Sequence, residues 1–195
     1  MPKPETTTQE LSRRPLRADA QRNYDKLLEA AREAFAEDGT AATLDDIARR
    51  AGVGIATLYR HFPTRQHLLE AVYVDEVQAI ARSAADLAEL PPWEALDTWL
   101  HQYVGYAATK RALAEELLAY IDTDAEVFQA CRVAVVGAGD MLLERAQKAG
   151  VARPDTTFSD VGRIVAGLAA IRGTEPEQME RMLDIVLDGL RYSPR

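Results

Sequence analysis

The sequence predicts an all-α protein of about nine helices. Alanine and leucine are its commonest apolar residues, and only 7% of its residues are aromatic, a composition that favours packed helices over strands. Apolar residues recur at helical spacing along most of the chain. No segment of four or more residues alternates apolar and polar side chains with β-branched enrichment, as a half-buried strand would. These patterns argue against a β-sheet fold.

The composition is that of an ordinary globular protein. Of 195 residues, 47% are apolar and 28% are charged, which is enough to bury a core. The single cysteine, Cys131, excludes an internal disulfide and fits a reducing compartment. The start of the chain is polar. No apolar run approaches the length of about 18 residues that a helix needs to span a bilayer. We therefore expect a soluble, cytoplasmic protein with no membrane partner.

The first forty residues hold an arm and one helix. Residues 1–18 are rich in Pro, Thr and Arg and show no apolar periodicity, which predicts a flexible arm. From Asp19 the spacing predicts a helix that ends at Asp38-Gly39. Its buried face consists of Leu27, Leu28, Ala31, Ala34 and Phe35.

Two short helices joined by a glycine turn follow. Thr43 and Asp46 have the spacing of a capping box. Gly52 is placed to close the first helix in the left-handed conformation that glycine adopts at little cost. The second helix extends from about Gly54 to His61, and Pro63 ends it.

Six further helical patterns complete the chain. Their boundaries fall at prolines, at glycine and, between the second and third pattern, at Lys110-Arg111. For the last helix, Thr174 and Glu177 have capping-box spacing, and Pro176 lies in the first turn. The six patterns cover residues 65–90, 93–109, 112–121, 125–149, 158–171 and 175–190.

The net charge of −8 is divided unevenly along the chain. Residues 1–72 hold 11 basic and 11 acidic residues, whereas residues 73–195 hold 12 and 20. Affinity for phosphate depends on local positive charge rather than on the sum, although an acidic second part equally fits ordinary solubility. The basic residues of the first part that have few acidic neighbours are Arg13, Arg14, Arg17 and Arg22.

Residues 40–69, TAATLDDIARRAGVGIATLYRHFPTRQHLL, have the layout of a helix-turn-helix. In this motif one helix enters the DNA major groove and the others brace it. The second short helix opens with small residues, from Gly54 to Thr57, so that its backbone can approach the bases. It also carries Tyr59, Arg60 and His61. The motif predicts binding to double-stranded DNA.

The same residues resemble the DNA-binding domain of TetR-family transcriptional regulators. The resemblance covers residues 24–72. It rests on three runs of residues, which are IARRAGVG at 47–54, TLYRHF at 57–62 and RQHLL at 65–69.

The resemblance also implies a domain organisation. After the arm, it places a DNA-binding domain at 19–64 and a domain that binds a small-molecule effector and dimerises at 65–195. Within the second domain, Pro92–Leu96 and Ala107–Arg111 resemble the SbtR-like C-terminal domain of one subgroup. Each subunit of a homodimer would then present one recognition helix to DNA.

We expect the DNA contacts to divide between base edges and phosphates. Ile55 and Ala56 are placed to meet thymine methyl groups, and Thr57 is placed to bond a base edge or a phosphate. Arg60 can read a guanine edge or bind a phosphate. The sequence leaves both alternatives open for Thr57 and Arg60.

The resemblance implies further contacts beside the groove. Tyr59 and His61 would contact phosphates, although Tyr59 taken alone also fits a half-buried core aromatic. Thr43 would both cap its helix and contact a phosphate. Arg65 stands where the family more often has lysine and would bond a phosphate near the positive end of its helix. Gly54 replaces the usual serine, which removes one hydroxyl.

Two sets of residues in the second domain are candidates for ligand binding and dimerisation. A pocket needs an aromatic lining with a few polar groups, although aromatics at helical spacing more often fill the core. The candidate pocket residues are Trp99, His101, Tyr103, Tyr106, Tyr120, Phe128 and Cys131. The last two helices of two subunits would form a four-helix bundle, unless they pack only on their own core. The candidate dimer residues are Gly162, Ala166, Ala170, Met182, Ile185 and Val186.

The sequence carries no enzyme signature. It lacks HExxH, a metal-spaced Cys/His set, G-x-S-x-G and a phosphate-binding glycine loop, so we expect no catalytic residue, metal or cofactor. We predict a ligand-responsive repressor that binds a palindromic operator as a homodimer and is released by a small-molecule effector. The alternatives are a non-specific DNA-binding protein, and a helical small-molecule-binding protein or enzyme with a vestigial helix-turn-helix.

Overall fold

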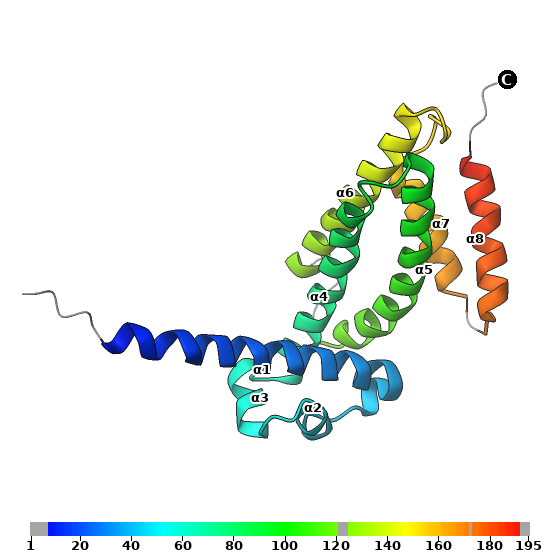
Figure 1. The fold of residues 1–195 in the computed structure, drawn as a ribbon. Coiled ribbons are helices and arrows are strands. Elements are labelled where there is room, and N and C mark those ends of the chain that lie inside the picture. Colours follow the sequence, from blue (N-terminus) through cyan, green and yellow to red (C-terminus); the bar gives the residue numbers. More distant parts are fainter. Residues whose placement is uncertain (1–7, 121–124, 172, 192–195) are drawn as a thin grey trace, which may run out of the picture. The chain divides into compact units, whose positions relative to one another are not determined.

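The structure, a computed structural model, describes residues 8–120, 125–171 and 173–191, without the side chains of residues 8–17, 40 and 108–112. This part of the chain contains eight α-helices, one 3-10 helix and no strand (Figure 1), so the predicted all-α fold is confirmed. None of the described helices is both long and apolar enough to cross a membrane. Outside the described part lie residues 1–7 of the predicted arm, Ile121, and the side chains of Arg13, Arg14 and Arg17.

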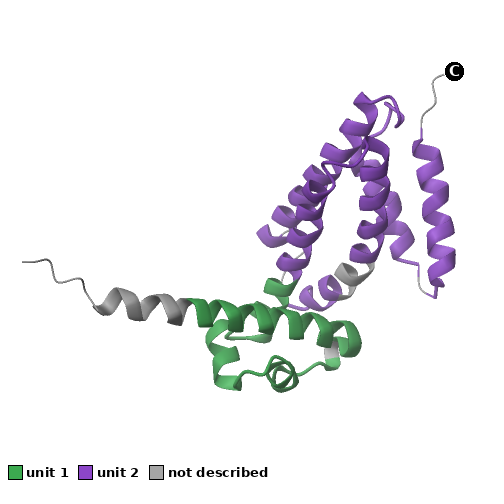
Figure 2. Ribbon diagram, viewed as in Figure 1, with its two compact units in different colours: residues 1–72 green, residues 73–195 purple. Residues whose placement is uncertain are grey.

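The chain forms two compact units, residues 1–72 and 73–195 (Figure 2). The division falls within α4 (Arg65–Asp86), so the first turns of this helix belong to the first unit. The predicted domain boundary, after residue 64, lies just before α4. The other helices of the first unit are α1 (Thr8–Asp38), the 3-10 helix η1 (Gly39–Ala41), α2 (Leu44–Arg50) and α3 (Ile55–His61). The other helices of the second unit are α5 (Pro92–Leu117), α6 (Glu126–Lys148), α7 (Phe158–Ala169) and α8 (Pro176–Leu190).

The helix α1 is longer than the sequence analysis predicted. It begins at Thr8 instead of Asp19, so the backbone of residues 8–18 is helical where an arm was expected. A missing apolar stripe argues against packing and not against helix formation. The Gln, Glu, Leu and Arg residues of this segment all have high helix propensity.

The core of the first unit is built from the apolar faces of its helices. Ala31, Ile47 and Leu58, from α1, α2 and α3, are fully or almost fully buried. Gly39 and Gly52 follow α1 and α2 with φ angles of 54° and 66°. Both glycines therefore adopt the left-handed conformation that ends a helix. The sequence predicted this conformation for Gly52 and predicted the end of α1 at Asp38-Gly39.

In the second unit, α5 packs against α6 and α7, and α7 packs against α8. The helix α5 runs from Pro92 to Leu117 without interruption, so the predicted break at Lys110-Arg111 is wrong. These two basic residues interrupt the apolar pattern. Lysine and arginine are good helix formers, however, and the backbone continues through them.

The start of α8 also differs from the prediction. Its N-cap is Glu175, which makes no side-chain capping bond. The Thr174 hydroxyl instead donates to the carbonyl oxygen of Ile171 at 3.3 Å. The predicted box between Thr174 and Glu177 is therefore wrong, because the helix starts one residue later. Pro176 lies in the first turn as predicted.

Candidate functional site

The helix α3 presents a polar side to solvent and an apolar side to the core. Ala56, Tyr59 and Arg60 are exposed, and Tyr59 leaves 48% of its surface accessible. Leu58 is fully buried. Gly54 is the N-cap in an extended conformation, without a side-chain capping bond. Tyr59 therefore keeps about half of its surface accessible to an external partner.

Arg60 has different surroundings from the two arginines of α2. Nη1 of Arg50 lies 2.6 Å from Oε2 of Glu37, and its Nη2 lies 3.0 Å from Oδ2 of Asp38. Arg49 pairs with an aspartate of its own helix. Arg60 forms no ion pair with any residue in the described part of the chain. Its charge is therefore available to an external partner.

Aromatic contacts hold the end of α3 against α1. The ring centroid of Tyr24 lies 5.2 Å from that of Phe62 and 5.9 Å from that of His61. Phe62 is buried, whereas His61 keeps part of its surface accessible, as do Ile55 and Thr57 at the start of α3. The His61 ring is thus fixed at the edge of the exposed side of the helix.

Thr43 caps α2 as predicted. Its Oγ1 accepts a hydrogen bond from the backbone N–H of Asp46 at 3.2 Å and donates one to Oδ2 of Asp46 at 2.8 Å. Hydrogen bonds from Arg49 and then from Thr43 hold the pKa of the Asp46 carboxyl below its usual value. Thr43 is nevertheless exposed, so an external group can reach it.

Arg65, the first residue of α4, points back to the turn between α1 and α2. Its Nη1 donates a hydrogen bond to the carbonyl oxygen of Ala42, and its Nη2 lies 3.5 Å from the carbonyl oxygen of Gly39. The guanidinium carbon lies 5.0 Å from the centroid of the Phe35 ring. The half-buried guanidinium is therefore engaged within the first unit.

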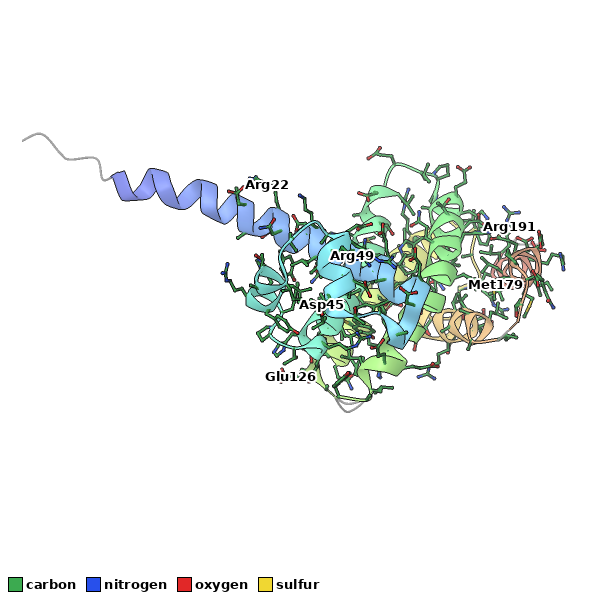
Figure 3. The ribbon with its side chains drawn as sticks, turned by 90° about the horizontal axis from the view of Figure 1, so that it is seen from below. Arg22, Asp45, Arg49, Glu126, Met179 and Arg191 are labelled. Atoms are coloured by element: carbon green, nitrogen blue, oxygen red, sulfur yellow. The ribbon has the colours of Figure 1, made fainter. Side chains whose placement is uncertain are left out.

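Arg22 was expected to stand almost unopposed by acidic residues. Arg22 lies on α1 (Figure 3), where it forms an exposed ion pair with Asp19. Exposed pairs of this kind contribute little to stability, and a phosphate can therefore replace the carboxylate at small cost.

In the second unit, an aromatic stack fills the space between α5 and α7. The rings of Trp99 and Tyr103 are stacked, with their centroids 5.4 Å apart. The Phe158 ring lies edge-on to both, with its centroid 5.3 Å from that of Trp99 and 5.7 Å from that of Tyr103. Trp99 is fully buried, and its indole N–H donates to the carbonyl oxygen of Ile80 at 2.9 Å. These contacts fit the interpretation of Trp99 and Tyr103 as core residues.

A second group of candidate pocket residues combines buried rings with polar atoms. Tyr106, Phe128 and Cys131 are buried, and the Phe128 ring meets that of Tyr73 edge-on at 5.2 Å. Burial raises the pKa of the Tyr73, Tyr103 and Tyr106 phenols. Tyr73 was not among the predicted pocket residues, because its apolar spacing on α4 indicated only a core position.

Two further candidate pocket residues have other surroundings. Tyr120 leaves 48% of its surface exposed. Nδ1 of His101 lies 2.9 Å from the carbonyl oxygen of Asp97, and its Nε2 lies 3.4 Å from Oε2 of Glu180. His101 therefore connects α5 with α8 at a half-exposed position.

The candidate dimer residues differ in their exposure. Ala166, Ala170 and Ile185 are exposed, and Ile185 leaves 72% of its surface accessible. Met182 and Val186 are half-buried. Five of the six residues therefore have surface that a second subunit could cover.

The sixth residue, Gly162, packs inside the second unit. A Cβ atom at Gly162 would lie 3.2 Å from Cε1 of Phe158, and one at Gly139 would lie 2.3 Å from Cγ of the same ring. Both glycines let Phe158 approach the backbone closely. Gly162 thus fits the alternative in which it packs on the core of its own subunit.

Two family models match the chain. The one described as bacterial regulatory proteins of the tetR family matches residues 27–72. The one described as the C-terminal domain of SbtR-like transcriptional regulators matches residues 91–192. Together they cover α2, α3 and all four helices from α5 to α8, so both resemblances found in the sequence are confirmed.

Solved structures share the fold over most of the chain. A TetR transcriptional regulator from Streptomyces coelicolor is 41% identical, with 87% of this chain and 99% of that chain covered and a TM-score of 0.77. A TetR transcription regulatory protein from Mycobacterium vanbaalenii is 37% identical, with 91% and 99% covered and a TM-score of 0.76.

A curated relative matches over a shorter length. An HTH-type transcriptional regulator of Staphylococcus aureus (strain MRSA252) is 33% identical over 91 residues, which are 45% of this chain and 48% of the relative. The chain therefore spans about half the length of this curated relative.

Proposed function

Because the chain belongs to the TetR family of transcriptional regulators, we propose that it is a ligand-responsive repressor that acts in the cytoplasm. It binds a palindromic operator as a homodimer and leaves the operator when a small-molecule effector binds. The observation that carries this proposal is the exposed side of α3, where Tyr59 and Arg60 face outward from a helix with a buried opposite side.

In this proposal, α3 is the recognition helix. Ile55, Ala56 and Thr57 lie at its start, where small side chains let the backbone approach the bases. Arg60, exposed and without an ion-pair partner in the described part of the chain, reads a guanine edge or binds a phosphate. Flanking phosphates are bound by Thr43, Tyr59 and His61, while Gly54 leaves room for the backbone of the DNA.

The proposed dimer interface is the accessible apolar surface of α7, of the two residues that follow it, and of α8. Ile164 and Ile171 expose 52% and 49% of their surfaces. They add to the five predicted residues that keep accessible surface, which are Ala166, Ala170, Met182, Ile185 and Val186. Pairing α7 and α8 across a two-fold axis forms a four-helix bundle. The two recognition helices then meet successive major grooves, about 34–36 Å apart.

The proposed effector site is the buried group of Tyr73, Tyr106, Phe128 and Cys131. It combines aromatic rings with hydroxyl and thiol groups, as small-molecule sites do. An effector that binds more tightly to a conformation with mismatched spacing of the recognition helices shifts the dimer into that conformation and releases the DNA.

Fluorescence anisotropy tests the proposal. The probe is the DNA fragment upstream of the protein's own gene, and an unrelated fragment of equal length is the control. We expect binding to the first fragment to be at least about a thousandfold tighter, with two subunits on each site by analytical ultracentrifugation.

The other outcomes identify the alternatives. Equal affinity for both fragments would indicate a non-specific DNA-binding protein. A monomer that binds neither fragment at low salt would indicate a vestigial helix-turn-helix and overturn the proposal.

A further inference from the structure

We propose that Arg65 is a positioning residue that clamps the turn between α1 and α2, and that it acts on DNA binding through this turn rather than by direct contact with a phosphate. The inference rests on the proposed function of α3 as the recognition helix. It concerns which residue sets the geometry of that helix.

The clamp joins three segments of the first unit. Arg65 opens α4, and Phe35 belongs to the last part of α1. Gly39 is the first residue of the 3-10 turn, and Ala42 directly follows the turn. Nη1 donates to the carbonyl oxygen of Ala42, Nη2 lies 3.5 Å from that of Gly39, and the guanidinium lies over the Phe35 ring at 5.0 Å. One side chain thus holds the end of one helix and the start of another.

The position of the clamp matters because Ala42 directly precedes Thr43, the N-cap of α2. The N–H of Ala42 donates to the carbonyl oxygen of Gly39 at 3.2 Å, so Arg65 binds both ends of the same turn. The turn sets where α2 begins, and α2 packs directly against α3. A displaced turn therefore displaces the recognition helix.

The chemistry of this contact needs an arginine. The guanidinium is a planar fork with five N–H donors, and it stacks on aromatic faces. A lysine carries one compact charge on a flexible stem. Its three N–H donors radiate from a single nitrogen, so it lacks the two separate nitrogens with which Arg65 reaches the two carbonyl oxygens from a position over the Phe35 ring.

The Arg65→Lys variant therefore separates the clamp from a phosphate contact. A phosphate contact survives this substitution because the positive charge is kept. The clamp does not survive it. The lysine loses at least one of the two hydrogen bonds to the turn, and hydrogen bonds from a charged donor are among the stronger ones in proteins. We therefore expect Arg65→Lys to weaken DNA binding about tenfold.

The measurement is the anisotropy titration with the upstream DNA fragment, repeated over a series of KCl concentrations. Arg65→Ala is expected to weaken binding at least as much as Arg65→Lys, with the slope of log Kd against log[KCl] unchanged in both. Arg49→Lys is the matched control. Arg49 is exposed and, among the described residues, pairs with Asp46 of its own helix. We therefore expect the DNA affinity of Arg49→Lys to stay within about twofold of wild type.

Amide hydrogen exchange provides a second measurement that needs no DNA. In Arg65→Lys, exchange is expected to rise about tenfold at Asp46 and Ile47, whose N–H groups are capped by Thr43. Exchange at Leu27 and Ala31 in α1 should not change. Faster exchange at all four amides would show general destabilisation instead of a local clamp.

The result that would overturn the inference is specific. If Arg65→Lys binds like wild type and Arg65→Ala lowers the salt slope by about one, Arg65 is a phosphate contact. If the wild-type protein binds no DNA fragment, the proposed function fails. Unchanged exchange at Asp46 and Ile47 in Arg65→Lys would then overturn the clamp independently.

Discussion

The two units place their candidate functional residues in opposite ways. On α3 of the first unit, Tyr59 and Arg60 are exposed, whereas Leu58 and Phe62 fill the core. In the second unit, candidate pocket residues such as Trp99 are themselves core. When the partner lies outside the protein, helical periodicity distinguishes the residues that can contact it from the residues that fill the core. It cannot separate them in a bundle, where a pocket is lined by the same faces that stabilise the fold.

The Trp99→Ala substitution should cause the largest loss of stability. It removes a fully buried indole together with its stacking on Tyr103 and its hydrogen bond to the Ile80 carbonyl oxygen. We expect a loss of about 3–5 kcal/mol in the free energy of unfolding. Denaturant unfolding followed by circular dichroism measures this loss.

Tyr120→Ala is the control for an exposed aromatic of the same unit, and we expect its stability to change by less than about 0.5 kcal/mol. If Trp99→Ala left the stability unchanged, Trp99 would belong to a pocket and the contrast between the units would disappear.

The Gly139→Ala substitution tests close packing in the second unit. The added Cβ would lie 2.3 Å from Cγ of Phe158, so the ring or the helix must move. We expect a loss of about 1–3 kcal/mol in stability, measured by the same denaturant unfolding.

Gly137→Ala is a matched control on the same helix. Gly137 is exposed, and a Cβ at this position would have no neighbour within 4 Å. Because alanine is the better helix former, we expect Gly137→Ala to stabilise the protein by about 0.5–1 kcal/mol. Equal effects at both glycines would show that Phe158 does not pack as tightly as the structure indicates.

The Arg60→Ala substitution tests an exposed candidate residue of the first unit, in contrast to the buried candidates of the second. Arg60 is exposed and has no ion-pair partner in the described part of the chain, so its removal should change stability by less than about 0.5 kcal/mol. If it reads a guanine edge, discrimination at one operator position should fall by about 1–3 kcal/mol.

Binding to a set of operator variants with single base changes measures this effect. A uniform loss of affinity across all variants would assign Arg60 to a phosphate instead.

The sequence allowed the fold class, most helix boundaries and the α3 surface to be predicted. Glycines were informative because glycine is the residue that most readily adopts a positive φ, as Gly39 and Gly52 do after α1 and α2. The errors at the start of α1 and within α5 arose where a pattern of burial was used to locate a helix end, whereas the start of α8 was misplaced by one residue because Thr174 and Glu177 have capping-box spacing without forming the box. The apolar pattern stops at Lys110-Arg111, but the helix does not, because burial depends on neighbouring helices and helix formation depends on the local backbone.

The second unit was less predictable for a physical reason. Whether an aromatic side chain stacks in a core depends on residues distant in sequence, as Trp99 and Phe158 show. The role of Gly139 likewise depends on a ring from another helix. The contacts of Arg65 with Gly39 and Ala42 were missed because the resemblance already offered a phosphate as its partner.

Removing either of the two threonine caps should have the smallest effect on stability. In the first unit Thr43 caps α2 with Asp46, and in the second unit Thr157 caps α7 in a full capping box with Asp160. Replacing either threonine with alanine should cost about 1 kcal/mol of stability. Only Thr43→Ala should also weaken DNA binding, because Thr43 is proposed to contact a phosphate. Anisotropy titrations of the two variants measure the difference.

The pH dependence of stability provides a second test of the Thr157 cap. Hydrogen bonds from its side chain and then from its backbone N–H lower the pKa of Asp160. A carboxyl with a lowered folded-state pKa stabilises the fold above its unfolded pKa, and this stabilisation is lost as the pH falls through the folded pKa. Thr157→Ala brings the pKa of Asp160 closer to its usual value, so the variant should lose less stability than wild type on acidification below about pH 5. Parallel losses, measured by denaturant unfolding at a series of pH values, would show that the cap does not determine the charge state of Asp160.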